Sequence, residues 1–251
     1  MKLVLDGKTV EAKAGEYILA LARREGKRIP SLCHHDGVEA VGACRLCVVE
    51  ITRPEWDGWT RLVTSCLFPV EEGLHVMTAS PKVVETRATL LDMQLARCPN
   101  SEVIKGWAAE YGIERTSFEE RVNGDNCILC DVCVRVCEAV GRNAIARTSR
   151  GIQKVIGTPL EFDDDRSCVG CLACAHACPT GAIPFTEANG KRTIWDHQFD
   201  LALCPDTGDV LGTSEQLDHF AKKAGLPRDY FNKSDRARKL ETARKFVKVL
   251  G

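Results

Sequence analysis

The sequence predicts an α+β protein, and three observations lead to this fold class. Short strand-like runs separated by turn residues fill positions 1–80. Two cysteine runs of identical spacing occupy positions 127–178. Apolar residues recur at helical spacing in 81–97, 214–224 and 233–249. The predicted domains are therefore an N-terminal unit at 1–80, a helical connector at 81–123, a cysteine-rich unit at 124–190, and a mostly helical, basic C-terminal extension at 191–251.

Length and composition restrict the possibilities further. A chain of 251 residues can hold one large domain or two to three small ones, and a hydrophobic content of 44% allows a packed core. The formal net charge of −1 gives no overall attraction to nucleic acid or to an anionic membrane. No run approaches the length of a membrane span, and the start M-K-L-V-L-D-G-K-T-V does not resemble a secretion signal. We therefore expect a cytoplasmic protein without direct membrane insertion.

The N-terminal unit contains strand and helix patterns in alternation. Lys2–Leu5 and Thr9–Ala12 flank the dipeptide Asp6-Gly7, a strong hairpin signal. A helix is predicted over Tyr17–Glu25, where apolar residues at 17, 18, 21 and 22 share one face and Gly26 ends the run. Further strands are predicted at 48–52, 61–63 and 74–77.

Four cysteines of this unit have the spacing C-x10-C-x2-C-x18-C: Cys33, Cys44, Cys47 and Cys66. In a chain without a signal sequence, C-x2-C pairs indicate metal ligands rather than disulfides. Four soft thiolates are the donor set of a [2Fe-2S] cluster, and small residues at 37, 42 and 43 let backbone N–H groups approach it. The alternative is a zinc knuckle with four thiolate ligands.

The two later cysteine runs both read C-x2-C-x2-C-x3-C, the ligand spacing of bacterial [4Fe-4S] ferredoxins, which they resemble. In that family the fourth cysteine of each run binds the other cluster. The resemblance therefore implies one cluster on Cys127, Cys130, Cys133 and Cys178, and a second on Cys168, Cys171, Cys174 and Cys137. Pro179 matches the family pattern, whereas Glu138 stands where the first run would have proline. The insert at 141–166 is expected to form an added hairpin around Gly151.

The N-terminal stretch L-C-H-H-D-G-V…G-A-C-R-L-C-V-V-E resembles the [2Fe-2S] domain of the large iron–sulfur subunit of respiratory complex I. The same domain occurs in iron-only hydrogenases, NAD-linked hydrogenases and NAD-dependent formate dehydrogenases. The resemblance covers about residues 1–190 and implies a β-grasp fold for the first domain. It also implies two partners: a flavin-containing NAD(P)H dehydrogenase subunit and a catalytic oxidoreductase subunit.

The connector departs from this family. A helix is predicted over 81–97, with proline in its first turn. The family's next cluster is bound by H-x3-C-x2-C-x5-C, and the matching positions here are Gln94, Cys98, Ser101 and Trp107. Amide, hydroxyl and indole groups do not replace imidazole and thiolate on iron, so we predict that this cluster is absent. Cys98 is then expected to be a buried apolar thiol, with a redox role as the alternative.

Several other polar features have ordinary interpretations. We expect His34, His35 and His176 to be hydrogen-bonding or surface residues, and the acidic run at 163–165 to be a solvated loop. Cys204-Pro205 lacks the second cysteine pair that zinc would need. Segment 221–251 has ten Lys and Arg against three Asp and Glu. We interpret it as a solvated helix face, ahead of docking on an acidic partner and of RNA binding.

The motifs point to electron transfer. The sequence has no dinucleotide or phosphate-binding glycine motif and no recognisable nucleophile, so no catalytic residue is predicted. One [2Fe-2S] and two [4Fe-4S] clusters would form a relay between a flavin subunit and a low-potential catalytic subunit, so the chain acts as an enzyme only within an assembly. The alternatives are a free-standing polyferredoxin and a redox-sensing or nucleic-acid-binding module.

Overall fold

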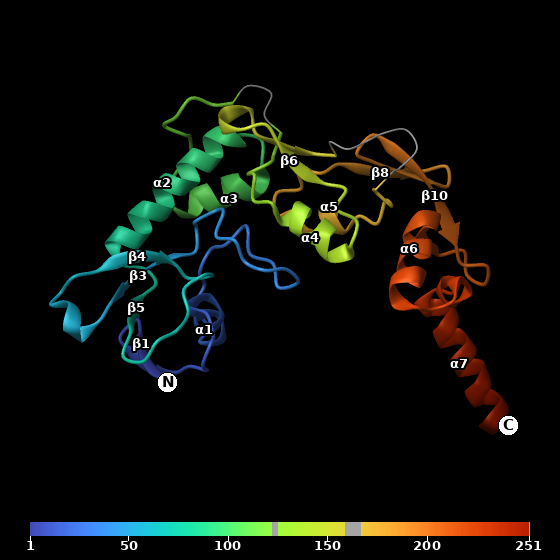
Figure 1. Cartoon of the computed structure of the whole chain (residues 1–251), viewed down its shortest axis with the longest axis horizontal. Coiled ribbons are helices and arrows are strands. Elements are labelled where there is room, and N and C mark those ends of the chain that lie inside the picture. Colours follow the sequence, from blue (N-terminus) through green and yellow to red (C-terminus); the bar gives the residue numbers. More distant parts are fainter. Residues whose placement is uncertain (122–124, 159–166, 251) are drawn as a thin grey trace. The chain divides into compact units, whose positions relative to one another are not determined.

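The computed structural model describes residues 1–121, 125–158 and 167–250 (Figure 1). The chain folds as two compact units. Unit 1 comprises Met1–Arg135 and Ala177–Ala182, and unit 2 comprises Val136–His176 and Ile183–Gly251. The chain therefore passes from one unit to the other three times. The predicted connector end at Asn123-Gly124 and the acidic run at 163–165 lie outside the described residues.

Unit 1 is built on a five-stranded sheet of order β2-β1-β5-β3-β4, in which β1 and β5 are parallel and the other neighbours antiparallel. The strands are β1 (Lys2–Leu5), β2 (Lys8–Glu11), β3 (Val48–Thr52), β4 (Arg61–Thr64) and β5 (His75–Met77). Asp6 and Gly7 both have positive φ, 48° and 80°, so the predicted hairpin turn is confirmed. All five strands lie where the sequence predicted them, to within about one residue.

Helix α1 (Ile18–Arg24) packs on this sheet through one face. Ile18, Leu19, Leu21 and Ala22 are fully buried and belong to one core cluster with apolar residues of β1, β3 and β5. Burial of each large apolar side chain contributes about 1.5–3 kcal/mol, so α1 and the sheet stabilise one another. The predicted helix at 17–25 is confirmed.

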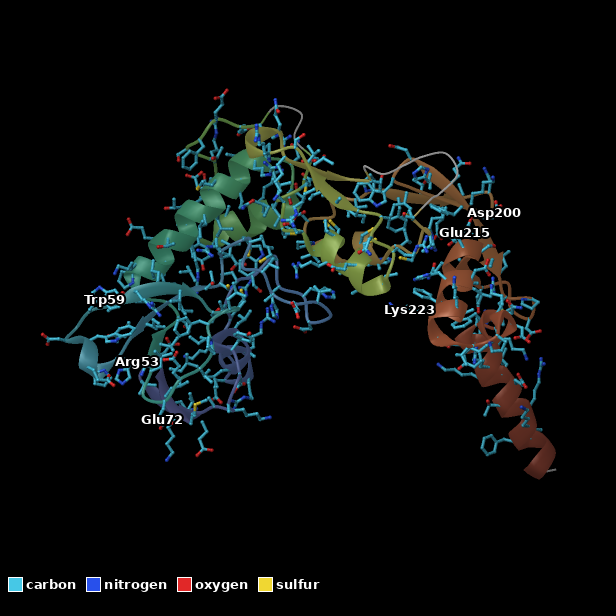
Figure 2. All side chains as sticks on the ribbon, in the orientation of Figure 1. Arg53, Trp59, Glu72, Asp200, Glu215 and Lys223 are labelled. Carbon is cyan, nitrogen blue, oxygen red and sulfur yellow. The ribbon has the colours of Figure 1, made fainter. Side chains whose placement is uncertain are left out.

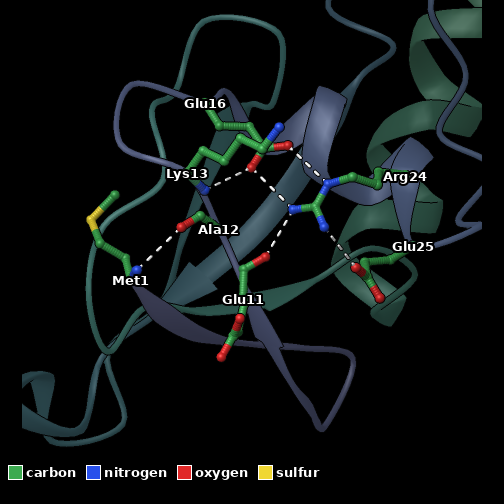
Figure 3. A network of polar contacts seen from close by, with 7 residues as sticks. All are labelled: Met1, Glu11, Ala12, Lys13, Glu16, Arg24 and Glu25. Atoms are coloured by element: carbon green, nitrogen blue, oxygen red, sulfur yellow. Dashed lines mark hydrogen bonds and ion pairs between the residues drawn. The ribbon is translucent and has the colours of Figure 1, made fainter.

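Polar contacts fix the segment between β2 and α1 (Figure 3). The Arg24 guanidinium donates to both Glu16 carboxylate oxygens, at 3.2 and 3.1 Å, and to the Glu11 carbonyl at 2.8 Å. Glu16 also accepts the Lys13 backbone N–H at 3.0 Å. These side chains are partly exposed and each pair contributes little alone, but together they hold the entry to α1.

Two helices follow the sheet. Ser80 caps α2 (Pro81–Arg97) by accepting the Val83 N–H, and Ser101 caps α3 (Glu102–Glu110) by accepting the Ile104 N–H. The predicted helix at 81–97 is confirmed. The connector is less helical than predicted, because the chain leaves α3 at Tyr111-Gly112, where Gly112 has φ 75°, and residues 113–121 form no helix.

The cysteine-rich segment contains short elements. Helix α4 (Val132–Val140) carries Cys133 and Cys137 of the first cysteine run, and α5 (Ala173–Ala177) carries Cys174 of the second and ends one residue before Cys178. Strands β6 (Ala146–Thr148) and β7 (Val155–Gly157) pair antiparallel around the 3-10 turn Gly151–Gln153. The predicted hairpin around Gly151 is therefore confirmed.

The C-terminal extension contains the helices predicted at 214–224 and 233–249, but a sheet that the sequence analysis did not predict precedes them. Residues 185–213 form an antiparallel sheet of order β11-β10-β9-β8, made of β8 (Phe185–Ala188), β9 (Lys191–Ile194), β10 (His197–Leu203) and β11 (Val210–Thr213). The two-residue turn Asn189-Gly190 joins β8 to β9, and the turn Trp195-Asp196 joins β9 to β10. All four turn residues have positive φ. The Asn-Gly dipeptide is a hairpin signal that the sequence interpretation overlooked.

Helices end the chain. Helix α6 (Ser214–Ala224) begins with a capping box between Thr213 and Gln216 and ends at Gly225, whose φ is 64°. A 3-10 turn (Arg228–Phe231) precedes α7 (Asp235–Leu250). Within unit 2, Lys223 of α6 donates to the Ala139 and Val140 carbonyls at the end of α4, at 2.7 and 2.9 Å (Figure 2). Among the described helices, none is both long and apolar enough to span a bilayer.

Candidate metal centres

The first candidate centre is formed by the four cysteines of the N-terminal sheet domain. Cys33, Cys44, Cys47 and Cys66 are at most 4% exposed. Backbone N–H groups point at the sulfurs: that of Cys44 lies 3.3 Å from Cys33 Sγ, and that of Leu32 lies 3.4 Å from Cys44 Sγ. Such N–H donors stabilise negative charge on sulfur.

The loop geometry depends on a glycine. Gly42 has φ 63°, and a Cβ at this position would lie 2.6 Å from the Leu67 side chain. A residue with a side chain would therefore have to displace the Leu67 side chain and adopt a left-handed backbone conformation that glycine adopts more readily.

The same four thiols form two hydrogen-bonded pairs, Cys33 with Cys44 and Cys47 with Cys66. Hydrogen bonding to the Cys33 side chain lowers the pKa of Cys44 to about 7, and hydrogen bonding to Cys66 lowers the pKa of Cys47 to about 6. In each pair the thiolate form is thereby favoured at one cysteine, while the same hydrogen bond raises the pKa of its partner, Cys33 or Cys66. Among the described residues, no three His, Cys, Asp or Glu side chains converge closely enough to hold a single metal ion.

The second candidate centre lies in unit 1. Cys127, Cys130, Cys133 and Cys178 all belong to this unit, although Cys178 comes from the second cysteine run. Burial, with a smaller contribution from the neighbouring Cys178 and Cys127 thiols, raises the pKa of Cys130 to about 11. Backbone N–H groups again face sulfur, with Leu129 N at 3.4 Å from Cys127 Sγ and Ala182 N at 3.3 Å from Cys178 Sγ.

The third candidate centre lies in unit 2, where four cysteines line one small cavity. They are Cys137, Cys168, Cys171 and Cys174, and the rest of the lining is almost wholly apolar. The Ala144 N–H lies 3.2 Å from Cys137 Sγ, and the Gly170 N–H lies 3.5 Å from Cys168 Sγ. Gly170 has φ 62°, and a Cβ there would lie 2.7 Å from the Phe199 ring. Strand β10 therefore packs closely on the loop that carries Cys168 and Cys171.

Four buried or half-buried arginines donate hydrogen bonds to backbone carbonyls of the loops that carry the cysteines. The sequence analysis did not identify these arginines, because they belong to no motif. Their bonds run from Arg87 to Val48 O at 2.6 Å, from Arg97 to Cys127 O at 2.8 Å, from Arg142 to Ser167 O at 2.6 Å and from Arg192 to Gly170 O at 2.7 Å. Each acceptor carbonyl is a ligand cysteine's own or lies within two residues of one. These arginines fix the cysteine loops, and Arg192 is itself paired with Glu187 at 2.6 Å.

The four positions of the predicted missing centre have structural roles. Ser101 caps α3, and the Gln94 carbonyl accepts the Cys98 N–H at the end of α2. Trp107 stacks under the Arg28 guanidinium, 4.5 Å from the ring centroid. Cys98 is fully buried, as predicted. Ser101 thus caps a helix and Trp107 stacks on an arginine, whereas the Gln94 side-chain Oε1 is buried without a hydrogen-bond partner among the described residues.

The three histidines beside the cysteines take part in ordinary contacts. His34 Nε2 lies 3.2 Å from Asp36, and His35 Nδ1 accepts the Gly37 N–H at 3.1 Å. The His176 ring packs edge-on against Phe185. Cys204 is buried in unit 2, where the Ser234 backbone N–H lowers its pKa to about 6.

A groove of about 500 Å³ opens beside the N-terminal cysteine loop. It lies along β4, the edge strand of the sheet, and its walls include Leu67, Phe68 and Leu90. Arg45 and Arg61 also line it, and within the described part of the chain neither guanidinium pairs with a carboxylate. The groove is therefore both apolar and positively charged.

Comparison with known families assigns both cysteine regions. Residues 1–81 match the 2Fe-2S iron-sulfur cluster binding domain, and residues 126–182 match the 4Fe-4S dicluster domain. The chain thus carries a two-iron domain followed by a four-iron domain, as the sequence predicted.

Comparison with individual proteins gives a consistent picture. The chain is 30% identical to a subunit of the NADH-quinone oxidoreductase of Rhizobium meliloti, over 91% of this chain and 28% of that protein. It is 31% identical to the alpha subunit of NADPH-Fe(3+) oxidoreductase of Geobacter sulfurreducens, over 91% of this chain and 29% of that protein. The chain spans less than a third of the length of these two relatives.

Among solved structures, the chain resembles one from a crystal structure of NAD+-reducing [NiFe]-hydrogenase in the H2-reduced state. The TM-score is 0.57 at 28% identity, with 72% of this chain and 85% of that chain covered. The resemblance to iron–sulfur subunits of NAD(P)H-linked complexes, predicted from the sequence, is confirmed.

Proposed function

We propose that this chain is an electron-relay subunit that holds one [2Fe-2S] and two [4Fe-4S] clusters. One observation carries the proposal: the eight cysteines of the twin runs divide between the two units in the crossed sets that bacterial ferredoxins use. Cys178 joins the first run in unit 1, and Cys137 joins the second run around the cavity of unit 2. The proposed two-iron ligands are Cys33, Cys44, Cys47 and Cys66, in a domain whose mixed sheet and packed helix support the β-grasp assignment.

Bound clusters of these types accept and release single electrons. The protein residues set the conditions for that transfer. Backbone N–H groups directed at the sulfurs and arginines on the ligand-loop carbonyls stabilise added negative charge. Apolar walls such as Ile145 and Leu172 exclude water from the cavity of unit 2. The chain's own residues thus hold and tune the clusters but provide no substrate chemistry.

We further propose that a flavin-containing NAD(P)H dehydrogenase subunit docks on the groove beside the two-iron site, and that a catalytic oxidoreductase subunit receives the electrons. Arg45 and Arg61 lack carboxylate partners in the described chain, so an acidic partner face would complement them. Reversing both charges, R45E with R61E, should slow NAD(P)H-dependent reduction of the complex while its iron content stays unchanged. Unaltered reduction at low salt would reject this surface.

Metal analysis and spectroscopy test the cluster assignment. The anaerobically prepared chain should be brown and contain about ten irons and little zinc. Reduction should give one two-iron and two four-iron EPR signals. A colourless, zinc-loaded protein, or a further four-iron signal, would contradict the proposal.

A further inference from the structure

Arg135 connects two candidate centres that lie far apart in the sequence. It sits on α4, two residues after Cys133, and its guanidinium Nη2 donates to the Cys33 carbonyl at 2.8 Å. The same nitrogen lies 3.5 Å from the Cys130 carbonyl, and Nη1 donates to the Glu39 carbonyl. One side chain therefore contacts the backbone of a proposed two-iron ligand and of a proposed four-iron ligand, all within unit 1.

The guanidinium is suited to fixing a spacing. Its donors point in set directions from a rigid plane, so bonds to two loops define both the separation and the orientation of those loops. A lysine at the same place would keep the charge but would replace the fork with one flexible donor. The acceptors are backbone carbonyls, so changing the Cys33 or Glu39 side chain would not remove the contact points.

The positive charge of Arg135 is partly buried and has no carboxylate partner in the described part of the chain. Its Nε is buried without an acceptor among the described residues. A partly buried cation without an anionic partner is costly. Eight thiolates of the two proposed centres would supply the missing negative charge on either side of it.

We propose that Arg135 is a positioning residue that sets the gap between the two-iron site and the first four-iron site, so that one electron passes directly between them. The inference rests on the proposed function and adds the route within unit 1. The step moves one electron from the donor site to the acceptor site, and no bond forms or breaks.

The test compares two Arg135 variants in the full-length, anaerobically reconstituted chain. Arg135→Gln removes the charge and the fork, and Arg135→Lys keeps only the charge. In the wild-type protein, the reduced two-iron EPR signal should relax faster when the neighbouring four-iron site is also reduced. Both variants should lose most of this enhancement, and electron transfer between the sites should slow about tenfold, since ångström-scale misplacement of reacting groups has effects of that size or larger. The potentials should shift only in Arg135→Gln.

Glu39→Ala is the matched control, because it removes an exposed side chain but keeps the carbonyl that Arg135 contacts. It should behave as wild type. Full iron content with unchanged relaxation and rate in both Arg135 variants would overturn the inference and leave the relay function intact. Loss of iron from both variants would also overturn it, because Arg135 would then be needed for the ligand loop itself. Absence of either EPR signal from the wild-type chain would instead contradict the proposed function.

Discussion

Two regions of unit 1 surround their buried cysteines differently. In the Cys33–Cys66 region, buried thiols are paired and backbone N–H groups point at sulfur. Around Cys98 the thiol is equally buried, and burial raises its pKa to about 11, as it does for the proposed ligand Cys130, but the described chain shows no backbone N–H bonded to the Cys98 sulfur. Burial alone therefore does not distinguish the proposed ligands from Cys98.

The difference lies in the backbone as much as in the ligand residues. The two-iron loop contains the positive-φ residues Gly42 and Arg45, which turn N–H groups inward. Around Cys98 the backbone is instead taken up by helix ends, because Cys98 caps the end of α2 and Ser101 caps the start of α3. A helix terminus uses its N–H and carbonyl groups for capping, so few remain to face a metal cluster.

Cysteine substitutions give the largest expected contrast between the regions. Cys66→Ser should abolish the two-iron EPR signal and reduce iron from about ten to about eight per chain. Cys98→Ala should leave both unchanged, because its thiol has no companion ligands. Iron analysis and EPR of the two purified variants provide the measurement. Loss of any cluster signal in Cys98→Ala would mean that the second region still binds iron.

Arg87 tests whether the helix that precedes Cys98 still supports the two-iron loop. It is 3% exposed and donates from α2 to the Val48 carbonyl, one residue beyond Cys47. Arg87→Met should destabilise the protein by about 2–3 kcal/mol, since it leaves a buried carbonyl without its charged donor. Anaerobic urea unfolding measures this loss. A change below the error of the method would show that the helix and the loop are independent.

Ser101 tests the idea that capping has replaced ligation. Ser101→Ala removes the acceptor of the Ile104 N–H and should cost about 1 kcal/mol of unfolding free energy. Ser101→Asp keeps a capping oxygen and should restore the stability. Iron content should stay at the wild-type level in both. The same urea titration checks the prediction, and equal stability of the alanine and aspartate variants would refute the capping role.

The smallest effect concerns the titration of Cys98. Burial raises its pKa from the ordinary 9.0 to about 11, so the native state holds this proton to higher pH than the unfolded state does. The contribution of Cys98 to stability is therefore complete below pH 9 and is lost as pH rises toward 11, by roughly 0.8 kcal/mol at pH 9.5. Cys98→Ala should unfold with a weaker pH dependence between pH 8 and 9.5. An identical dependence in both proteins would contradict a buried neutral thiol.

Local sequence signals predicted much of this structure. Asp6-Gly7, Ser80-Pro81 and the Thr213–Gln216 box mark turns and helix starts that act within a few residues, and the elements they begin lie as expected. Asn189-Gly190 is an equally local signal, so the sheet at 185–203 was predictable although it was missed. The cysteine motifs could be recognised in the sequence because binding of an iron–sulfur cluster restricts the spacing of its cysteine ligands.

The arginine contacts could not be read from the sequence. Arg135 reaches a carbonyl 102 positions away, and Arg192 one 22 positions away. Such contacts depend on where the folded chain brings a backbone carbonyl, and any residue type supplies that acceptor. Only the three-dimensional arrangement distinguishes these arginines from others on the surface.

The short return of the chain through Ala177–Ala182 into unit 1 has a consequence for biogenesis. With the proposed ligand sets, a nascent chain that has emerged only to residue 176 already offers complete sets for the two-iron centre and for the four-iron centre of unit 2. The four-iron centre of unit 1 still lacks Cys178. The order in which the ligand sets become complete therefore differs from the order in which they begin along the chain. The four-iron set of unit 1 begins before that of unit 2, but it is the last of the three to be completed.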